Sequence, residues 1–174
     1  MEFEIKELHT RTELKRFVDF PHHLYAGNPY WVPSLRKSEL DTLDWQVNPA
    51  FEHCRARYWI AESAGRIVGR IAAIINPKHE EVWGQPYMRF GWFDVVDDFD
   101  VTQALLDQVE KWAKEEKRTA IHGPLGFTNM DHTGLLLMDS MSWRRWRPDI
   151  TIPTIRTIWS RLAIVKMWTL LITR

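Results

Sequence analysis

The chain has little of several features that mark particular classes of protein. Its 174 residues include one cysteine, which excludes an intramolecular disulfide framework and favours a reducing cytoplasm. No apolar run approaches the roughly 18–20 residues of a membrane span, and Met1–Glu4 starts no secretory signal. Internal repeats and low-complexity segments are absent as well. We therefore expect a cytoplasmic globular domain without a transmembrane span, in which Cys54 is a small buried hydrophobe.

The formal net charge of zero hides an uneven distribution of charge. Residues 137–174 hold seven Lys or Arg and two Asp, so 16 basic and 21 acidic side chains lie in residues 1–136. A body with an acidic excess lacks the basic face that a nucleic acid requires, so we expect no nucleic-acid partner.

The clearest structural pattern runs from Tyr58 to Asp97. Two apolar runs, 58–62 and 67–76, flank the polar turn Ser63-Ala64-Gly65-Arg66, as in a β-hairpin. The second run is apolar at nearly every position after Arg70, which predicts a central strand covered on both faces. Arg70 must then reach solvent or a carboxylate. A polar loop with Pro77 and Pro86 leads to a third strand at 88–96.

The other elements follow from shorter patterns. We predict a strand at 3–8, a helix from Thr10 or Thr12 to Phe20 that Pro21 ends, and a short helix at 34–44. Asp100 and Gln103 resemble a capping box at the start of a helix to about Lys117. A further strand is expected at 119–124. This order predicts an α+β fold.

Several motifs in this order carry a family resemblance. The chain resembles the Gcn5-related N-acetyltransferase (GNAT) superfamily and, within it, the bacterial ceramide-synthase-like branch. The residues that carry the resemblance are Leu24-Tyr25, Pro29-Tyr30-Trp31-Val32-Pro33, Asn48-Pro49-Ala50-Phe51-Glu52-His53, Gly69 to Asn76, Phe90-Gly91-Trp92-Phe93-Asp94, and Gly123-Pro124 with Asp131 and Gly134. The resemblance implies a mixed, mainly antiparallel sheet flanked by helices and incomplete at the C-terminus, with residues 1–136 as the N-terminal part of an acyltransferase domain.

The resemblance also implies acyl transfer from a coenzyme A thioester to a small-molecule or lipid amine, with acyl-CoA as co-substrate. The pantetheine arm would pair with the end of the fourth strand, at Phe93, Asp94, Val95 and Val96. The family's glycine-rich diphosphate loop at the next helix is replaced here by Val96-Asp97-Asp98-Phe99-Asp100, which has three carboxylates and no glycine. Carboxylates at that place repel a diphosphate. The coenzyme binds in a shifted pose, another acyl carrier replaces it, or binding is lost.

Four residues are candidates for the chemistry and for substrate contact. Asp94 and His122 are the candidate catalytic groups, because amine acylation needs proton acceptors and donors. A salt bridge at Asp94 and a hydrogen-bonded strand histidine at His122 are the structural alternatives. Asn129 and Asp131 are candidate substrate contacts, although such residues also build turns. His22-His23 has no third ligand at useful spacing, so we expect no metal site.

From Leu137 the composition changes abruptly. Residues 137–174 contain four Trp, six Ile and five Thr but no Gly, Glu, Asn, Gln, His, Phe or Tyr, and they show neither a helical nor a strand period. A Trp/Arg-rich segment can contact a membrane surface. Back-translation one nucleotide earlier instead reads Val-Asp-Gly-Phe-Asp-Glu-Leu-Ala and then Tyr-Asn-Tyr-Pro-Tyr-Tyr-Pro, which continues the family pattern.

We therefore predict a frameshift near codon 137, which would make 137–174 a poorly ordered, out-of-frame tail. The expected function is an acyl-CoA-dependent N-acyltransferase that is truncated and inactive in this form. Two alternatives remain: a non-catalytic GNAT-shaped binding module, which the acidic loop at 97–100 favours, and a peripheral membrane protein that binds through its tail.

Overall fold

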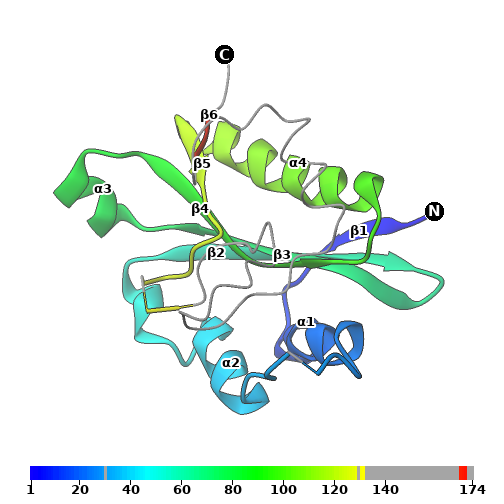
Figure 1. Ribbon diagram of the computed structural model, residues 1–174. Helices are drawn as coiled ribbons and strands as arrows, with labels where there is room; N and C mark the ends of the chain where they lie inside the picture. Colours follow the sequence, from blue (N-terminus) through cyan, green and yellow to red (C-terminus); the bar gives the residue numbers. More distant parts are fainter. Residues whose placement is uncertain (30, 129, 132–168, 172–174) are drawn as a thin grey trace, which may run out of the picture.

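One mixed sheet organises the molecule, and the computed structural model describes residues 1–29, 31–128, 130–131 and 169–171 of the chain (Figure 1). The six strands lie in the order β1-β2-β3-β4-β5-β6, and every neighbouring pair is antiparallel except β4 and β5, which are parallel. Their bounds are β1 Glu4–Glu7, β2 Arg55–Ser63, β3 Arg66–Ile75, β4 Tyr87–Val95, β5 Ala120–His122 and β6 Thr169–Leu171.

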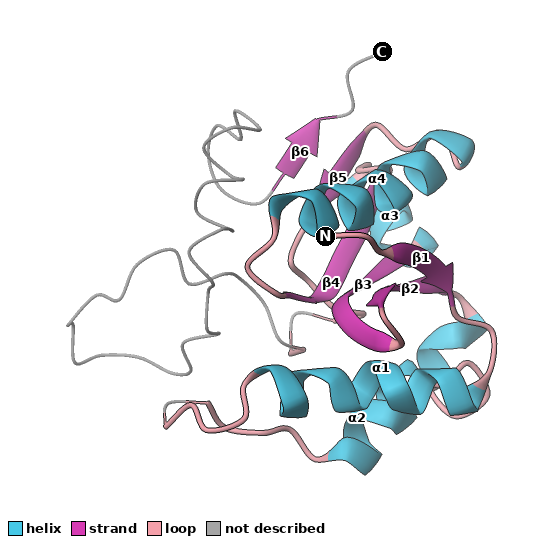
Figure 2. Ribbon diagram, turned by 90° about the vertical axis from the view of Figure 1, so that its right-hand side faces the viewer, coloured by secondary structure: helices cyan, strands magenta, loops and turns pink. Residues whose placement is uncertain are grey.

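Helices cover both faces of the sheet (Figures 1 and 2). On one face lie α1 (Arg11–Leu24) and α2 (Arg36–Leu43), and on the other lies α4 (Phe99–Glu115). A short helix, α3 (Pro77–Trp83), joins β3 to β4, and a 3₁₀ turn, η1 (Pro49–Glu52), precedes β2. Two apolar cores result, and β3 contributes to both with alternate side chains: Ile71 and Ala73 face α4, whereas Ala72 and Ile74 face α1 and α2. The predicted α+β fold with a doubly covered central strand is confirmed.

The β2–β3 hairpin also forms as predicted. Ala64 and Gly65 both have positive φ, 48° and 76°, which is the backbone of a two-residue turn between twisted strands.

Pro21 does not end α1, contrary to our prediction, because the helix continues to Leu24 with Pro21 inside it. A proline has no N–H to donate to the carbonyl four residues earlier, which is that of Phe17. Arg70 on β3 takes over this role, since its Nη1 donates to the Phe17 carbonyl over 2.9 Å. A tertiary contact thus satisfies the group that a sequence rule leaves without a partner.

Two other local predictions are wrong at helix starts. The segment after Pro77 is predicted to be a loop but forms α3, because the Asn76 side chain caps it and Gly84 ends it in the left-handed region. The long helix begins one residue before Asp100, with Asp98 as its N-cap in place of a capping box of Asp100 and Gln103. Thr10, by contrast, forms the predicted cap of α1, with Glu13 completing a capping box.

The predicted disorder of the tail mostly concerns residues outside those described, namely 137–168 and 172–174. Residues 169–171 are among the described residues, and as β6 their backbone pairs antiparallel with β5.

Candidate functional site

The second half of β4 has an edge that no described strand pairs with. Among the described residues, β5 pairs with β4 only from Tyr87 to Arg89. The chain then leaves the ladder through Gly123-Pro124, and the Leu125 N–H donates to the Phe90 carbonyl over 2.7 Å. From Gly91 to Val95, described strand pairing is with β3 alone. Such an edge offers backbone donors and acceptors to an extended ligand.

A β-bulge in β4 determines which side chains face each helix layer. Arg70 pairs with Asp94 and Ala72 with Gly91, so β4 has one residue more than β3 in this interval. Trp92 lies in the bulge with a positive φ of 45°. Phe90 before the bulge and Phe93 after it both belong to the core under α4. The extra residue therefore turns Asp94 toward α1 and α2.

An open pocket of about 820 Å³ lies on the same face of the sheet as Asp94. Helix α2, the η1 turn and the segment after β5 line it. Its apolar wall includes Leu35 and Val47, which are 79% and 47% exposed. Phe127 also lines it and packs against Trp92, with ring centroids 6.0 Å apart. Phe127 thus connects the pocket that it lines to Trp92 on β4.

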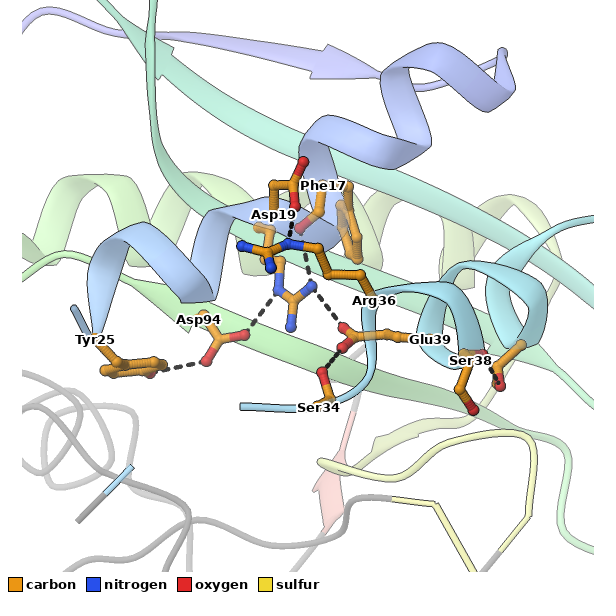
Figure 3. Close-up of polar contacts among 10 residues, drawn as sticks. Phe17, Asp19, Tyr25, Ser34, Arg36, Ser38, Glu39 and Asp94 are labelled. Atoms are coloured by element: carbon orange, nitrogen blue, oxygen red, sulfur yellow. Dashed lines mark hydrogen bonds and ion pairs between the residues drawn. The ribbon is translucent and has the colours of Figure 1, made fainter. Parts of the chain in front are cut away.

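Behind this junction, three charged side chains form a buried cluster (Figure 3). The Arg70 Nε donates to Asp94 Oδ2 over 2.8 Å, and its Nη1 donates to Glu39 Oε1 over 2.9 Å. The Tyr25 hydroxyl donates to Asp94 Oδ1 over 2.8 Å, and the Ser34 hydroxyl donates to Glu39. Glu39 belongs to α2, so the cluster ties the helix that lines the pocket to the strand that forms the edge.

The electrostatics of the cluster follow from its burial. The side chain of Arg70 is 6% exposed, that of Glu39 8% and that of Asp94 17%. Burial alone would lower the pKa of Arg70, but the charges and hydrogen bonds of its two carboxylate partners raise it overall. Arg70 therefore stays charged, and two carboxylates around one guanidinium leave a formal charge of minus one. The three residues of the cluster do not line the pocket, whereas Arg36 and Lys37 of α2 do.

The two candidate catalytic residues lie at different ends of the site. Asp94 belongs to the charged cluster and has the salt bridge that was its structural alternative. His122 on β5 pairs with Arg89, which is five residues before Asp94 on β4. At about 3.3 Å per residue, this separates His122 from Asp94 by roughly 15 Å along the strand. The structure does not bring the two together.

His122 lies in a cationic environment. Burial lowers its pKa, and the positive charges of Arg89 and His79 lower it further. Arg89 is itself 8% exposed, and its Nη1 donates to the carbonyls of Gly126 and Phe127, so it holds the loop that lines the pocket.

The candidate cofactor-binding residues form the end of β4 and its exit. Phe93 and Val95 point into the core under α4, so only their backbone is available to a ligand. The Val96 N–H donates to the Val68 carbonyl over 2.9 Å. Of these four positions, Asp94 alone presents a polar side chain.

Of the two candidate substrate contacts, Asn129 lies outside the described residues. Asp131 lines the pocket, and its Oδ2 accepts a hydrogen bond from the Thr128 N–H over 2.9 Å. It therefore builds the turn that was its alternative role and also faces the cavity.

The structure adds residues that the sequence did not suggest. Glu39 and Phe127 lie in no motif singled out above, and Tyr25 lies in a family motif but had no assigned role. Arg70, a charge within an apolar strand, was expected to reach solvent or a carboxylate, and it reaches two carboxylates. Trp92 is another addition, because its indole N–H is buried without an acceptor among the described residues.

The described residues contain no group of three or more His, Cys, Asp or Glu placed to hold a metal ion, and none of their helices has the length and apolarity to cross a membrane.

Comparisons of sequence identify two curated relatives. The chain is 36% identical over 127 residues to the protein YghO of Escherichia coli, a match that covers 73% of this chain and 32% of the relative. It is 34% identical over 131 residues to the bacterial ceramide synthase of Caulobacter vibrioides, over 74% of this chain and 34% of that protein. The chain thus spans about a third of the length of the curated relatives it matches. No protein-family model matches it.

Comparisons of structure identify the fold. A tandem GNAT protein from the clavulanic acid biosynthesis pathway matches with a TM-score of 0.53 and 19% identity, over 69% of this chain and 35% of that one. An acetyltransferase with acetyl-CoA from Clostridium acetobutylicum matches with a TM-score of 0.52 and 12% identity, over 84% of this chain and 96% of that one.

Proposed function

Since the chain has the GNAT fold and belongs with the bacterial ceramide-synthase-like relatives of that superfamily, we propose that it is part of an acyl-CoA-dependent N-acyltransferase. The observation that carries the proposal is the junction at Trp92. There Trp92, on the β4 edge that no described strand covers, packs against Phe127, which lines a pocket between α2 and the segment after β5. An edge that accepts an extended acyl-donor arm and a pocket that accepts a second substrate are the two halves of a transfer site.

The acceptor is proposed to be a small-molecule or lipid amine. The apolar wall with Leu35 and Val47 suits an alkyl chain, and the carboxylate of Asp131, which also lines the pocket, suits an ammonium group. The name of the Caulobacter relative, a bacterial ceramide synthase, supports a long-chain base among the candidates by analogy alone.

Asp94 is our candidate for the group that takes the proton from the incoming amine, with Arg70 and Tyr25 as positioning residues. Arg70 and Tyr25 bind different oxygens of the carboxylate, which fixes its orientation. His122 remains a predicted catalytic group, but it lies roughly 15 Å from Asp94 along the strand, so the two side chains cannot act on the same reacting atom.

We also propose that residues 137–174 are translated out of frame, so that the 174-residue chain is inactive by itself. The composition of the tail supports this, as does sequence similarity that extends over about three quarters of the chain. Sequencing the gene across codons 130–180 tests it. We expect a second open reading frame, shifted by one nucleotide, that continues for the length of a domain. A 174-codon frame without such a continuation would refute the out-of-frame tail.

The activity test compares the 174-residue chain with the chain continued in the second frame. We expect thiol release from acyl-CoA only with the continued chain, and only when a primary amine is present. Leu35→Asp should raise the KM for an alkyl amine at least tenfold and leave that for acyl-CoA unchanged, because Leu35 lines the pocket. Val82→Asp is the matched control, since Val82 is similarly exposed at 72% but lies on α3. Equal effects of the two variants, or no transfer at all, would contradict the proposal.

The non-catalytic binding module remains the second candidate, because one observation favours it. The start of α4, where a GNAT protein is expected to hold the coenzyme diphosphate, is capped by an aspartate of this chain.

A further inference from the structure

Two N–H groups in the first turn of α4 donate hydrogen bonds to a carboxylate of the chain itself. Asp98 is the N-cap, and its Oδ1 accepts hydrogen bonds from the N–H groups of Asp100 over 2.9 Å and Val101 over 3.2 Å. These are groups that an anion at a helix N-terminus would use. The Asp98 carboxylate therefore occupies the position of a phosphate.

The charge around this turn is negative as well. Asp97, Asp98 and Asp100 lie within four residues of each other in the sequence, and the amino group of Met1 lies 3.9 Å from Asp98 Oδ2. At separations of 5–10 Å each carboxylate repels a phosphate by about 0.5 kcal/mol or more, even at the dielectric constant of water. Residues 96–100 also contain no glycine that would let a diphosphate approach the backbone closely.

A diphosphate therefore does not fit this helix start, although an extended arm fits the edge of β4. We infer that this unit does not hold the diphosphate of coenzyme A, and that another unit of the longer protein holds it while this one supplies the β4 edge for the extended arm and the acceptor pocket. The inference rests on the proposed function. Its support outside the site is length: the curated relatives are about three times as long as the matched segment, and one solved structure of this fold is a tandem GNAT protein.

The direct test removes the negative charges and retains the helix cap. The variant Asp97→Asn, Asp98→Ser, Asp100→Asn keeps a hydroxyl that can cap α4. Asp107→Asn is the matched control, because Asp107 lies on the same helix beyond its first turn and hydrogen-bonds to Gln103. Calorimetric titrations of the 174-residue chain use coenzyme A and, separately, ADP as the diphosphate probe.

We expect the unaltered chain and Asp107→Asn to bind neither probe measurably, and the triple variant to bind both with dissociation constants at least tenfold below the detection limit of the titration. Circular dichroism should show equal helix content in all three. Coenzyme A binding by the unaltered chain in the micromolar range would overturn the inference. So would a folded triple variant that gains no affinity, because the carboxylates would then not be the cause of exclusion.

The continued chain separates this inference from the proposed function. If it transfers acyl groups and Asp98→Ser leaves the KM for acyl-CoA unchanged, both stand. If it transfers acyl groups and the same substitution changes that KM at least fivefold, the inference alone fails. If it transfers nothing while the titrations behave as expected, the proposed function alone fails.

Discussion

The buried cluster around Arg70 makes a quantitative prediction about stability. In Arg70→Met, the carboxylates of Asp94 and Glu39 lose their shared cation, and the Phe17 carbonyl loses its hydrogen-bond donor. Breaking a buried ion pair from one side costs about 3–5 kcal/mol, because it leaves uncompensated charge in a medium of low polarity. An unsatisfied buried carbonyl costs about 1–3 kcal/mol more, although water entering the vacated space will recover part of that. We expect Arg70→Met to lower the free energy of unfolding by about 4 kcal/mol.

The measurement is urea unfolding followed by tryptophan fluorescence, with the denaturant slope checked for equality between variants. Arg55→Met is the matched control. Arg55 also pairs with a carboxylate, donating to both oxygens of Glu116 over 2.8 and 2.6 Å, but its side chain is 56% exposed. A pair screened by solvent contributes at most about 1 kcal/mol.

The double variant Arg70→Met, Glu39→Gln refines this test. It neutralises one of the two carboxylates that Arg70→Met leaves without a cation, so the double variant should be more stable than Arg70→Met alone by at least about 1 kcal/mol. A loss below about 1 kcal/mol for Arg70→Met, or a loss equal to that of Arg55→Met, would refute the claim that the cluster holds α2 against β4.

Three further predictions follow from single residues. Burial raises the pKa of the Cys54 thiol, so we expect a disulfide reagent to label it slowly at pH 8 in the folded chain and rapidly in urea; fast labelling of the native chain would contradict its burial. Burial, and after it the charge of Arg89, lower the pKa of His122 in the folded chain, so the unfolded chain binds a proton at a higher pH than the folded one. The free energy of unfolding should therefore decrease as the pH falls below about 6.5. His122→Gln should reduce that decrease in a pH series of urea midpoints, and an unchanged pH dependence would exclude His122 as a contributor. A Cβ on Gly91 would lie 2.7 Å from the Leu125 carbonyl oxygen, so Gly91→Ala should destabilise the chain by about 1–3 kcal/mol, and an unchanged urea midpoint would show that the segment after β5 yields freely.

Local patterns in the sequence were sufficient wherever neighbouring residues decide the outcome. The hairpin depends on apolar strands and on Ala64-Gly65 at the turn, and the capping box depends on Thr10 and Glu13 three positions apart. The resemblance to the GNAT superfamily rested on motifs in the chain and correctly predicted the fold. The sequence required Arg70 to reach solvent or a carboxylate, because a charge in a buried strand cannot stay unpaired, and the structure pairs it with Glu39 and Asp94.

Only the tertiary structure decided what depends on residues far apart in the chain. Pro21 can stay inside α1 because Arg70, from another strand, binds the carbonyl that the proline leaves free. Asp94 faces α1 and α2 because one extra residue at Trp92 reverses the alternation of β4, and a strand pattern alone does not reveal such a bulge. The partners Glu39 and Tyr25 became neighbours of Asp94 only when α1 and α2 packed on the sheet. The sequence by itself thus determined most of the strands and the longer helices and restricted where Arg70 could lie, whereas the packing of the elements decided which residues meet at the site.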